Sequence, residues 1–171
     1  MERQFATFFI GNSRFGIDIL MVREINRHLD ITPTERSPEC VRGLLNLRGQ
    51  LVTVIDLGIR LGLGPQKIGP ESRCLVLKTS ADLASLQESG ILDDDTANDV
   101  TGLLIDRVGD MITIDEKELE PPPANMTGVD SKYLSNVVKL EDDLMIALRV
   151  GEILQLGSAQ KEVSASSGMH R

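Results

Sequence analysis

The chain has 171 residues, of which 41% are apolar and only 3% are aromatic, so its core must be built from Leu, Ile and Val. That length is enough for one domain or for two small lobes. The formal net charge of −8 argues against a nucleic-acid-binding protein, because neutralisation of phosphates supplies most of the affinity in that class.

The charge is distributed unevenly along the sequence. Residues 1–78 carry 11 basic and 8 acidic side chains, whereas residues 79–99 carry six acidic side chains and no basic one. Residues 100–157 carry 5 basic and 11 acidic side chains. The sequence therefore predicts one arginine-bearing surface and one acidic surface, an arrangement that suits protein partners.

Two features bear on the cellular compartment. Cys40 and Cys74 have no metal-ligand spacing, and we interpret them as free buried thiols in a reducing environment. The sequence shows no basic-then-apolar leader and no apolar run long enough to cross a bilayer. We therefore expect a cytoplasmic protein that reaches a membrane only through a partner already there.

Short β-rich runs separated by turn signals follow one another from the N-terminus, without a strong amphipathic helix. This pattern predicts an all-β fold, either a sandwich or small barrels. In chain order, the predicted strands cover residues 5–10, 14–19, 20–25, 51–57, 73–78, 100–108, 111–114, 134–140 and 144–148. Hairpin turns are predicted at residues 11–13, 109–110 and 141–143, and short helical turns at residues 37–39, 58–63 and 150–156. The remaining connections are predicted over residues 31–39, 64–71 and 120–123, all of which contain proline.

Residues 41–57, VRGLLNLRGQLVTVIDL, contain the most informative turn of the chain. An apolar lead-in is followed by a polar turn at Asn46, Arg48 and Gly49, and then by a strand with branched residues on both faces, which indicates cover on both sides. Gly49 lets the backbone turn tightly and lifts Arg48 clear of the core. Such an arginine is either a recognition group or simply solvated.

Residues 79–99, which we call the acidic segment, form the most unusual part of the sequence. Ser80 can cap a short helix that extends through Ser89, with Gly90 as the stop. We interpret the acidic segment as a surface insertion that is mobile in part. Residues 1–156 then form the folded unit, and residues 157–171 are expected to be a disordered tail.

The residues of common catalytic and metal sites are missing or poorly spaced. His28 and His170 do not suggest a catalytic pair or a zinc site. Residues 93–95 are three consecutive aspartates, but Ala97 occupies the third ligand position of a calcium loop and no glycine or terminal Glu follows in register. Gly62, Gly64 and Lys67 do not form a phosphate loop, since a proline interrupts them and no helix follows. We expect no cofactor and no metal.

Two blocks together carry more information than composition does. The run FGIDI at residues 15–19, followed by Val22 and Glu24, and the run GLLNLRGQLVTVIDL at residues 43–57 closely resemble the signature of the CheW family. Members of that family are adaptors that couple chemoreceptors to the histidine kinase CheA. The resemblance spans residues 5–154, and its further matches lie at residues 102–108, 112–121 and 134–148.

The resemblance implies two small five-stranded β-barrels packed together, each with its own apolar core, and no enzymatic activity. It also implies that the chain binds the regulatory domain of a CheA-type kinase and holds the cytoplasmic tip of a chemoreceptor in the groove between its lobes. The protein would then be cytoplasmic and associated with membrane receptor clusters.

Carried over position by position, the resemblance implies a partner-binding role for Val22, Glu24 and Arg48. Around them, Ile25 offers apolar contact area, and Asn46 and Gly49 shape the turn. The expected partner-binding residues are therefore Val22, Glu24, Ile25, Asn46, Arg48 and Gly49. Alternatively, Glu24 and Arg48 pair with each other on the surface, which contributes about 0–1 kcal/mol. Asp18 and Asp56, which also lie in the motifs, are interpreted as turn or cap residues.

The sequence departs from the family pattern in the acidic segment, where family members commonly have a short turn, and in the tail beyond Leu156. We hypothesise that the acidic segment selects which receptor or kinase the chain serves, by repelling a standard partner or attracting a basic one.

Three other functions are weighed against this one. The first is a CheW-like adaptor of a non-flagellar pathway, such as surface motility. The second is a small-barrel binder of nucleic acid or a small ligand, which predicts basic and aromatic grooves that this composition does not favour. The third is an enzyme with its site on loops.

Overall fold

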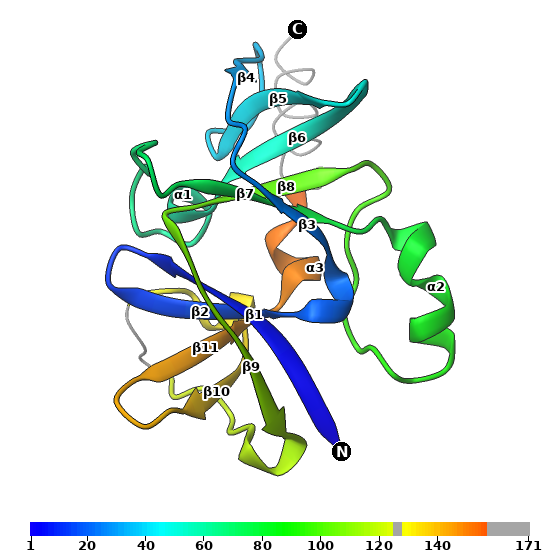
Figure 1. Ribbon diagram of the computed structural model, residues 1–171, viewed down its shortest axis with the longest axis vertical. Helices are drawn as coiled ribbons and strands as arrows, with labels where there is room; N and C mark the ends of the chain where they lie inside the picture. The colour runs from blue at the N-terminus through cyan, green and yellow to red at the C-terminus, as the bar shows by residue number, and fades with distance from the viewer. Residues whose placement is uncertain (125–127, 157–171) are drawn as a thin grey trace, which may run out of the picture.

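The computed structural model describes residues 1–124 and 128–156, and in these ranges the chain forms two β-sheets with a few short helices (Figure 1). The expected tail at 157–171, including His170, lies outside the described residues. The first sheet has the strand order β10-β11-β2-β1-β9. Its strands are β1 (Glu2–Ile10), β2 (Ser13–Asp18), β9 (Arg107–Asp115), β10 (Leu134–Lys139) and β11 (Leu144–Leu148).

The second sheet has the order β3-β7-β8-β6-β5-β4. Its strands are β3 (Val22–Asn26), β4 (Ile31–Thr32), β5 (Val41–Leu47), β6 (Gln50–Asp56), β7 (Arg73–Leu77) and β8 (Thr101–Ile105). The helical elements are η1 (Ile19–Met21), α1 (Leu57–Arg60), α2 (Ser80–Glu88), η2 (Glu116–Glu118), η3 (Ser131–Tyr133) and α3 (Val150–Ile153). The all-β class is thus confirmed.

The prediction of five strands is correct for the first sheet and wrong for the second, which has six. Two of its strands were not predicted. β4 lies inside the stretch predicted to be a loop, and β5 was interpreted as an apolar lead-in; the two strands pair with each other. Gly43 makes this pairing possible, because a Cβ atom at this position would lie 2.1 Å from the carbonyl oxygen of Thr32. The backbone of Gly43 also has a φ of 145°, which disfavours other residues.

Two predicted strands have different bounds in the structure. The run 20–25 is divided, because the carboxylate of Asp18 caps the 3-10 turn η1 and the strand begins only at Val22. The hairpin predicted at residues 109–110 is also wrong. The chain instead leaves β8 at Asp106 and crosses to the first sheet, where Gly109 lies within β9 against Thr7. The β-rich composition does not break at Asp106, so the change of sheet left no signal in the sequence.

The largest apolar cluster lies between the two sheets. Phe8, Phe15 and Ile17 come from the first sheet, and Ile55 and Leu103 come from the second. Smaller clusters lie against the other face of each sheet, around Val138 in the first and around Val54 in the second. The expectation that each half has its own core is therefore incomplete, because the main core is shared.

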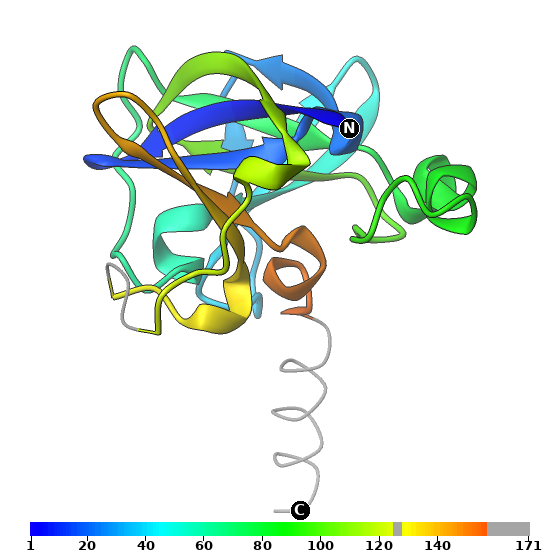
Figure 2. The same cartoon turned by 90° about the horizontal axis from the view of Figure 1, so that it is seen from below.

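The helices occupy the periphery of the two sheets. Figure 2 shows α1 and α3 on one side of the sheets, whereas α2 projects away from the body of the molecule. None of the helices within 1–124 and 128–156 has the length and apolar character needed to span a membrane.

Candidate partner-binding surface

The turn between β5 and β6 presents Arg48 at the tip of a tight hairpin. Leu47 pairs directly with Gln50, so the loop consists of Arg48 and Gly49 alone, with φ angles of 52° and 86°. Positive φ at both positions is the pattern of a type I′ turn, which matches the twist of a hairpin. The Oδ1 atom of Asn46 accepts a hydrogen bond from the Gly49 amide at 2.9 Å and closes the turn.

Arg48 adopts a backbone conformation that is unfavourable for its residue type. The left-handed region costs a residue with a Cβ atom about 1–3 kcal/mol, and Asn or Gly would occupy it more easily. The side chain gains nothing from burial, since 71% of it is exposed. A strained and exposed arginine on a rigid turn is an arrangement that recognition explains better than stability does.

The structure brings Glu24 to Arg48 although the two lie in different strands. The Arg48 guanidinium donates a hydrogen bond to the Oε2 atom of Glu24, and Asn26 donates to the Oε1 atom at 3.4 Å. The surface ion pair considered from the sequence is therefore present. Glu24 is half-buried, with 29% of its side chain exposed. The carboxylate of the pair is therefore partly enclosed, whereas the Arg48 guanidinium is accessible.

A register shift in β3 separates the apolar members of the expected set from the polar ones. Val22 lies opposite Leu77 and Ile25 opposite Leu75, whereas Glu24 lies opposite Val76. Residues directly opposite each other in a ladder share a face, so Val22 and Ile25 lie on the side of the shared core and Glu24 on the other. The simple alternation predicted for residues 20–25 is wrong here, because the shift between Val22 and Glu24 changes the parity.

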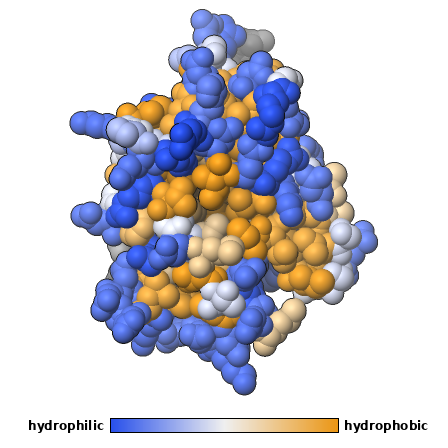
Figure 3. Space-filling view, viewed as in Figure 1, coloured by the Kyte–Doolittle hydropathy of each residue, from blue (hydrophilic) through white to orange (hydrophobic). Residues whose placement is uncertain are grey.

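Apolar surface accompanies this side of β3. Val22 packs against the shared core and Ile25 is 39% exposed. On the first sheet, Val108 and Met111 of β9 are also exposed. Figure 3 shows a band of apolar side chains across the middle of this face, over η1 and the crossing strand β9. The apolar area therefore lies on the opposite side of β3 from the Glu24–Arg48 pair.

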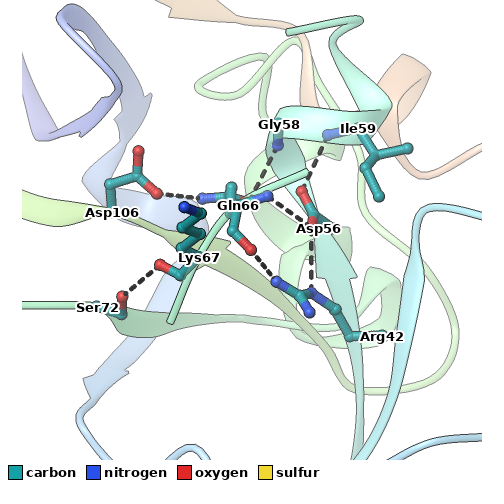
Figure 4. Close-up of polar contacts among 8 residues, drawn as sticks. All are labelled: Arg42, Asp56, Gly58, Ile59, Gln66, Lys67, Ser72 and Asp106. Carbon is teal, nitrogen blue, oxygen red and sulfur yellow. Dashed lines mark hydrogen bonds and ion pairs between the residues drawn. The ribbon is translucent and has the colours of Figure 1, made fainter. Parts of the chain in front are cut away.

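A buried polar network holds the base of the hairpin (Figure 4). Asp56 is fully buried, and its carboxylate accepts hydrogen bonds from the amides of Ile59 at 2.9 Å and Gln66 at 3.1 Å. The Nε atom of Arg42 lies 3.1 Å from the same carboxylate and forms an ion pair with it. The prediction that Asp56 is a cap residue is confirmed, since it caps α1. The same holds for Asp18, which caps η1.

The sequence analysis did not identify Gln66 as part of this network. Its side chain accepts a hydrogen bond from the Gly58 amide at 3.0 Å and donates to Asp106 at 3.1 Å. It thereby joins α1 to the crossing between the sheets. No local pattern marks Gln66, which lies in a turn-rich connection. The network therefore links β5, the end of β6 and α1, and holds the base of the β5–β6 hairpin in place.

The two thiols are free and buried, as predicted. Burial raises the pKa of the Cys74 thiol to about 12, with a smaller contribution from the Glu24 carboxylate. Burial also raises the pKa of Cys40. Both thiols are therefore protonated near neutral pH and are poor nucleophiles. In the part of the chain that the structure describes, no cluster of three His, Cys, Asp or Glu side chains could hold a metal ion.

Residues 4–157 match the model of the CheW-like domain. The chain belongs to the CheW family. Its relatives include the chemotaxis protein CheW of Helicobacter pylori, 30% identical over 153 residues that cover 89% of this chain and 81% of the relative. The chemotaxis protein CheW of Treponema pallidum is 28% identical over 158 residues, which cover 92% and 85% of the two chains.

The fold agrees with this assignment. The crystal structure of the scaffolding protein TtCheW from Thermoanaerobacter tengcongensis is 27% identical, with a TM-score of 0.73 over 90% of this chain and 88% of that one. The resemblance seen in the sequence is thereby confirmed, and the chain is a chemotaxis scaffold or adaptor of the CheW type.

Proposed function

We propose that this CheW-family chain is a non-catalytic adaptor that couples chemoreceptors to a CheA-type histidine kinase. In this proposal it binds the regulatory domain of the kinase and the cytoplasmic tip of the receptor. It is cytoplasmic and joins membrane receptor clusters through these partners. The observation that carries the proposal is the Glu24–Arg48 pair on a rigid hairpin tip, because Arg48 has no structural reason to occupy a strained and exposed position.

The geometry supports exchangeable binding. An exposed ion pair contributes only about 0–1 kcal/mol, so a carboxylate of the partner can replace or join Glu24 at little cost. A guanidinium paired with a carboxylate forms charge-assisted hydrogen bonds that fix orientation. The apolar surface at Val22 and Ile25 then supplies contact area on the other side of the same strand.

A non-catalytic role also agrees with the state of the two thiols. Cys40 and Cys74 are both buried and both have a raised pKa, so neither is prepared for nucleophilic chemistry.

Kinase autophosphorylation in receptor-containing membranes tests the proposal. We expect stimulation to require receptor, kinase and this chain together, and Arg48→Glu to abolish it because the variant places two carboxylates side by side. The melting temperature should change little, since the lost ion pair is exposed. Lys67→Glu is the matched control, because it makes the same charge change at an exposed position in the connection after α1.

Two results would contradict the proposal. Full stimulation by Arg48→Glu would show that the hairpin tip is not a coupling surface. A large drop in melting temperature for this variant would show that Arg48 is structural, and the observation that carries the proposal would fall with it.

A further inference from the structure

Two neighbouring residues of β3 contact the β5–β6 hairpin through their side chains. Glu24 accepts a hydrogen bond from the Arg48 guanidinium, and the guanidinium of Arg23 donates to the Oε1 atom of Gln50 at 3.1 Å. β7 and β8 lie between β3 and β6 in the strand order, so in the described part of the chain the hairpin is not paired with β3 through backbone hydrogen bonds. The two side-chain contacts therefore hold the hairpin tip against β3.

A β-bulge in β3 allows both side chains to reach the hairpin. Val22 and Glu24 pair with two consecutive residues of β7, so Arg23 between them is an extra residue in the ladder. In a regular strand, side chains at neighbouring positions point to opposite faces. The bulge interrupts this alternation, and Arg23 and Glu24 contact the same hairpin instead.

The acidic segment supplies a second acceptor for Arg23. The guanidinium also donates to the Oδ2 atom of Asp82, in the first turn of α2, at 2.9 Å. Hydrogen bonds from the Thr79 amide and from Arg23 lower the pKa of the Asp82 carboxyl, so the carboxylate is ionised near neutral pH. One planar guanidinium thus joins α2 to the hairpin, and Asp82 orients it toward Gln50.

The acidic segment has a fixed position from which Asp82 can act. Leu83, the next residue, is completely buried in the shared core. The amide of Ser80 donates a hydrogen bond to the carbonyl of Ala97 at 2.9 Å and joins the two ends of the segment. The carboxylate of Asp94 accepts hydrogen bonds from the first two amides of α3, at 2.7 Å and 2.9 Å. Although α2 projects from the molecule in Figure 2, the turn that carries Asp82 is therefore held against the body.

We propose that Asp82 and Arg23 are positioning residues, through which the acidic segment holds the hairpin tip and keeps Arg48 in the orientation that a partner recognises. When a carboxylate of the partner replaces or joins Glu24, the contact of Arg23 with Gln50 remains and keeps the tip in place. The acidic segment thus acts on binding from within the chain and not by touching the partner. This inference rests on the proposed function, because it names the residues that orient the same Arg48 surface.

Amide hydrogen exchange of the free protein, followed by NMR, tests this contact without a partner. The Gly49 amide reports on the hairpin tip, because it donates to Asn46 and closes the turn. We expect Asp82→Ala to accelerate its exchange about three- to fivefold, the factor that one exposed ion pair supports. Exchange of the β8 amides should stay within about twofold of wild type, because the hairpin opens locally while the core remains intact.

Kinase autophosphorylation in receptor-containing membranes tests the consequence for coupling. Asp82→Ala should raise the concentration of this chain needed for half-maximal stimulation about three- to fivefold, because Arg48 is then less well oriented. Asp82→Glu keeps a carboxylate for Arg23, and Glu is favoured at this position of a capping box. This variant should bring both measurements back to within about twofold of wild type.

Thr79→Val is the matched control for the role of Asp82 as a helix cap. Thr79 and Asp82 form a reciprocal capping box, so Asp82→Ala loses part of the cap together with the contact to Arg23. Thr79→Val removes the hydroxyl acceptor and leaves the Asp82 carboxylate in place. It should match the wild-type protein in both measurements. Equal effects of Thr79→Val and Asp82→Ala would show that Asp82 acts only as a cap and would overturn the inference.

The other outcomes separate this inference from the proposed function. Unchanged exchange of the Gly49 amide in Asp82→Ala would overturn the inference, and weaker stimulation by the same variant would then mean that Asp82 meets the partner directly. If the wild-type protein stimulates the kinase and Asp82→Ala does so at the same concentration, the positioning role fails and the adaptor function stands. No stimulation by the wild-type protein would overturn the adaptor function and, with it, the role of Asp82 in coupling.

Discussion

At the scale of single residues, Arg48 illustrates a compromise between stability and recognition. Its backbone occupies the left-handed region at the first position of a type I′ turn, where Asn is the favoured residue. The exposed ion pair with Glu24 offsets only part of this cost. Asn at this position would therefore form the turn at a lower backbone conformational cost than Arg does.

We predict that Arg48→Asn stabilises the fold by about 0.5–1 kcal/mol when it is introduced into a Glu24→Gln background. The background variant removes the ion pair first, so that only the backbone preference changes. Urea unfolding of the single and double variants measures the difference. An equal or lower free energy of unfolding for the double variant would show that Arg48 is not strained.

At the scale of secondary-structure elements, the acidic segment shows how local and distant signals combine. The sequence indicated a helix that starts near Ser80, and α2 covers Ser80–Glu88. The cap is Thr79 rather than Ser80, because Thr79 and Asp82 form a reciprocal capping box. The triple aspartate run did not suggest its actual role, in which Asp94 accepts hydrogen bonds from the amides of Val150 and Gly151.

We predict that Asp94→Ala lowers the free energy of unfolding by about 1–3 kcal/mol, because two partly buried amides lose their acceptor. The acidic segment should also become more sensitive to limited proteolysis. Asp93→Ala, at the exposed neighbouring position, is the matched control and should change stability by less than about 0.5 kcal/mol. Equal effects of the two variants would rule out an anchoring role for Asp94.

The same contact predicts a pH dependence. Burial raises the pKa of the Asp94 carboxyl above its ordinary value of 3.8, and hydrogen bonds from Gly151, Asp95 and Val150 only partly oppose this. The folded state therefore holds this proton more tightly than the unfolded state does. The contribution of Asp94 to stability is greatest below pH 3.8 and falls as the pH rises through the raised pKa. Relative to wild type, Asp94→Asn should become more stable across that interval, as measured by urea unfolding at successive pH values.

At the scale of the whole molecule, the shared core makes the two sheets one structural unit. Val54 lies in the cluster on the far face of the second sheet and is completely buried, and its strand continues into Ile55 of the shared core. A destabilising substitution in β6 therefore affects both apolar clusters. The fold should unfold in a single cooperative transition rather than sheet by sheet.

We predict that Val54→Asp prevents folding, because it buries a carboxylate without a partner. Leu51→Asp makes a comparable change three positions earlier in β6, where the side chain is 60% exposed, and it should leave the protein folded. Circular dichroism and size-exclusion chromatography distinguish the two outcomes. A folded Val54→Asp protein would contradict the assignment of that side chain to the core.

The sequence by itself determined the features that depend on near neighbours. Strand character, the tight turn at Arg48 and Gly49, and the caps at Asp18 and Asp56 follow from residue type and spacing within a few positions. The paired motifs also gave the family, because they combine these local requirements at a fixed separation.

Only the tertiary structure decided the features that join distant parts of the chain. The Glu24–Arg48 pair, the Gln66 network and the contact of Asp94 with α3 each connect residues that no local pattern relates. The register shift in β3 moved Val22 and Ile25 to one face, because the pairing with β7 overrode simple alternation. Such contacts depend on how the two sheets pack, and packing is set by the shared core as a whole.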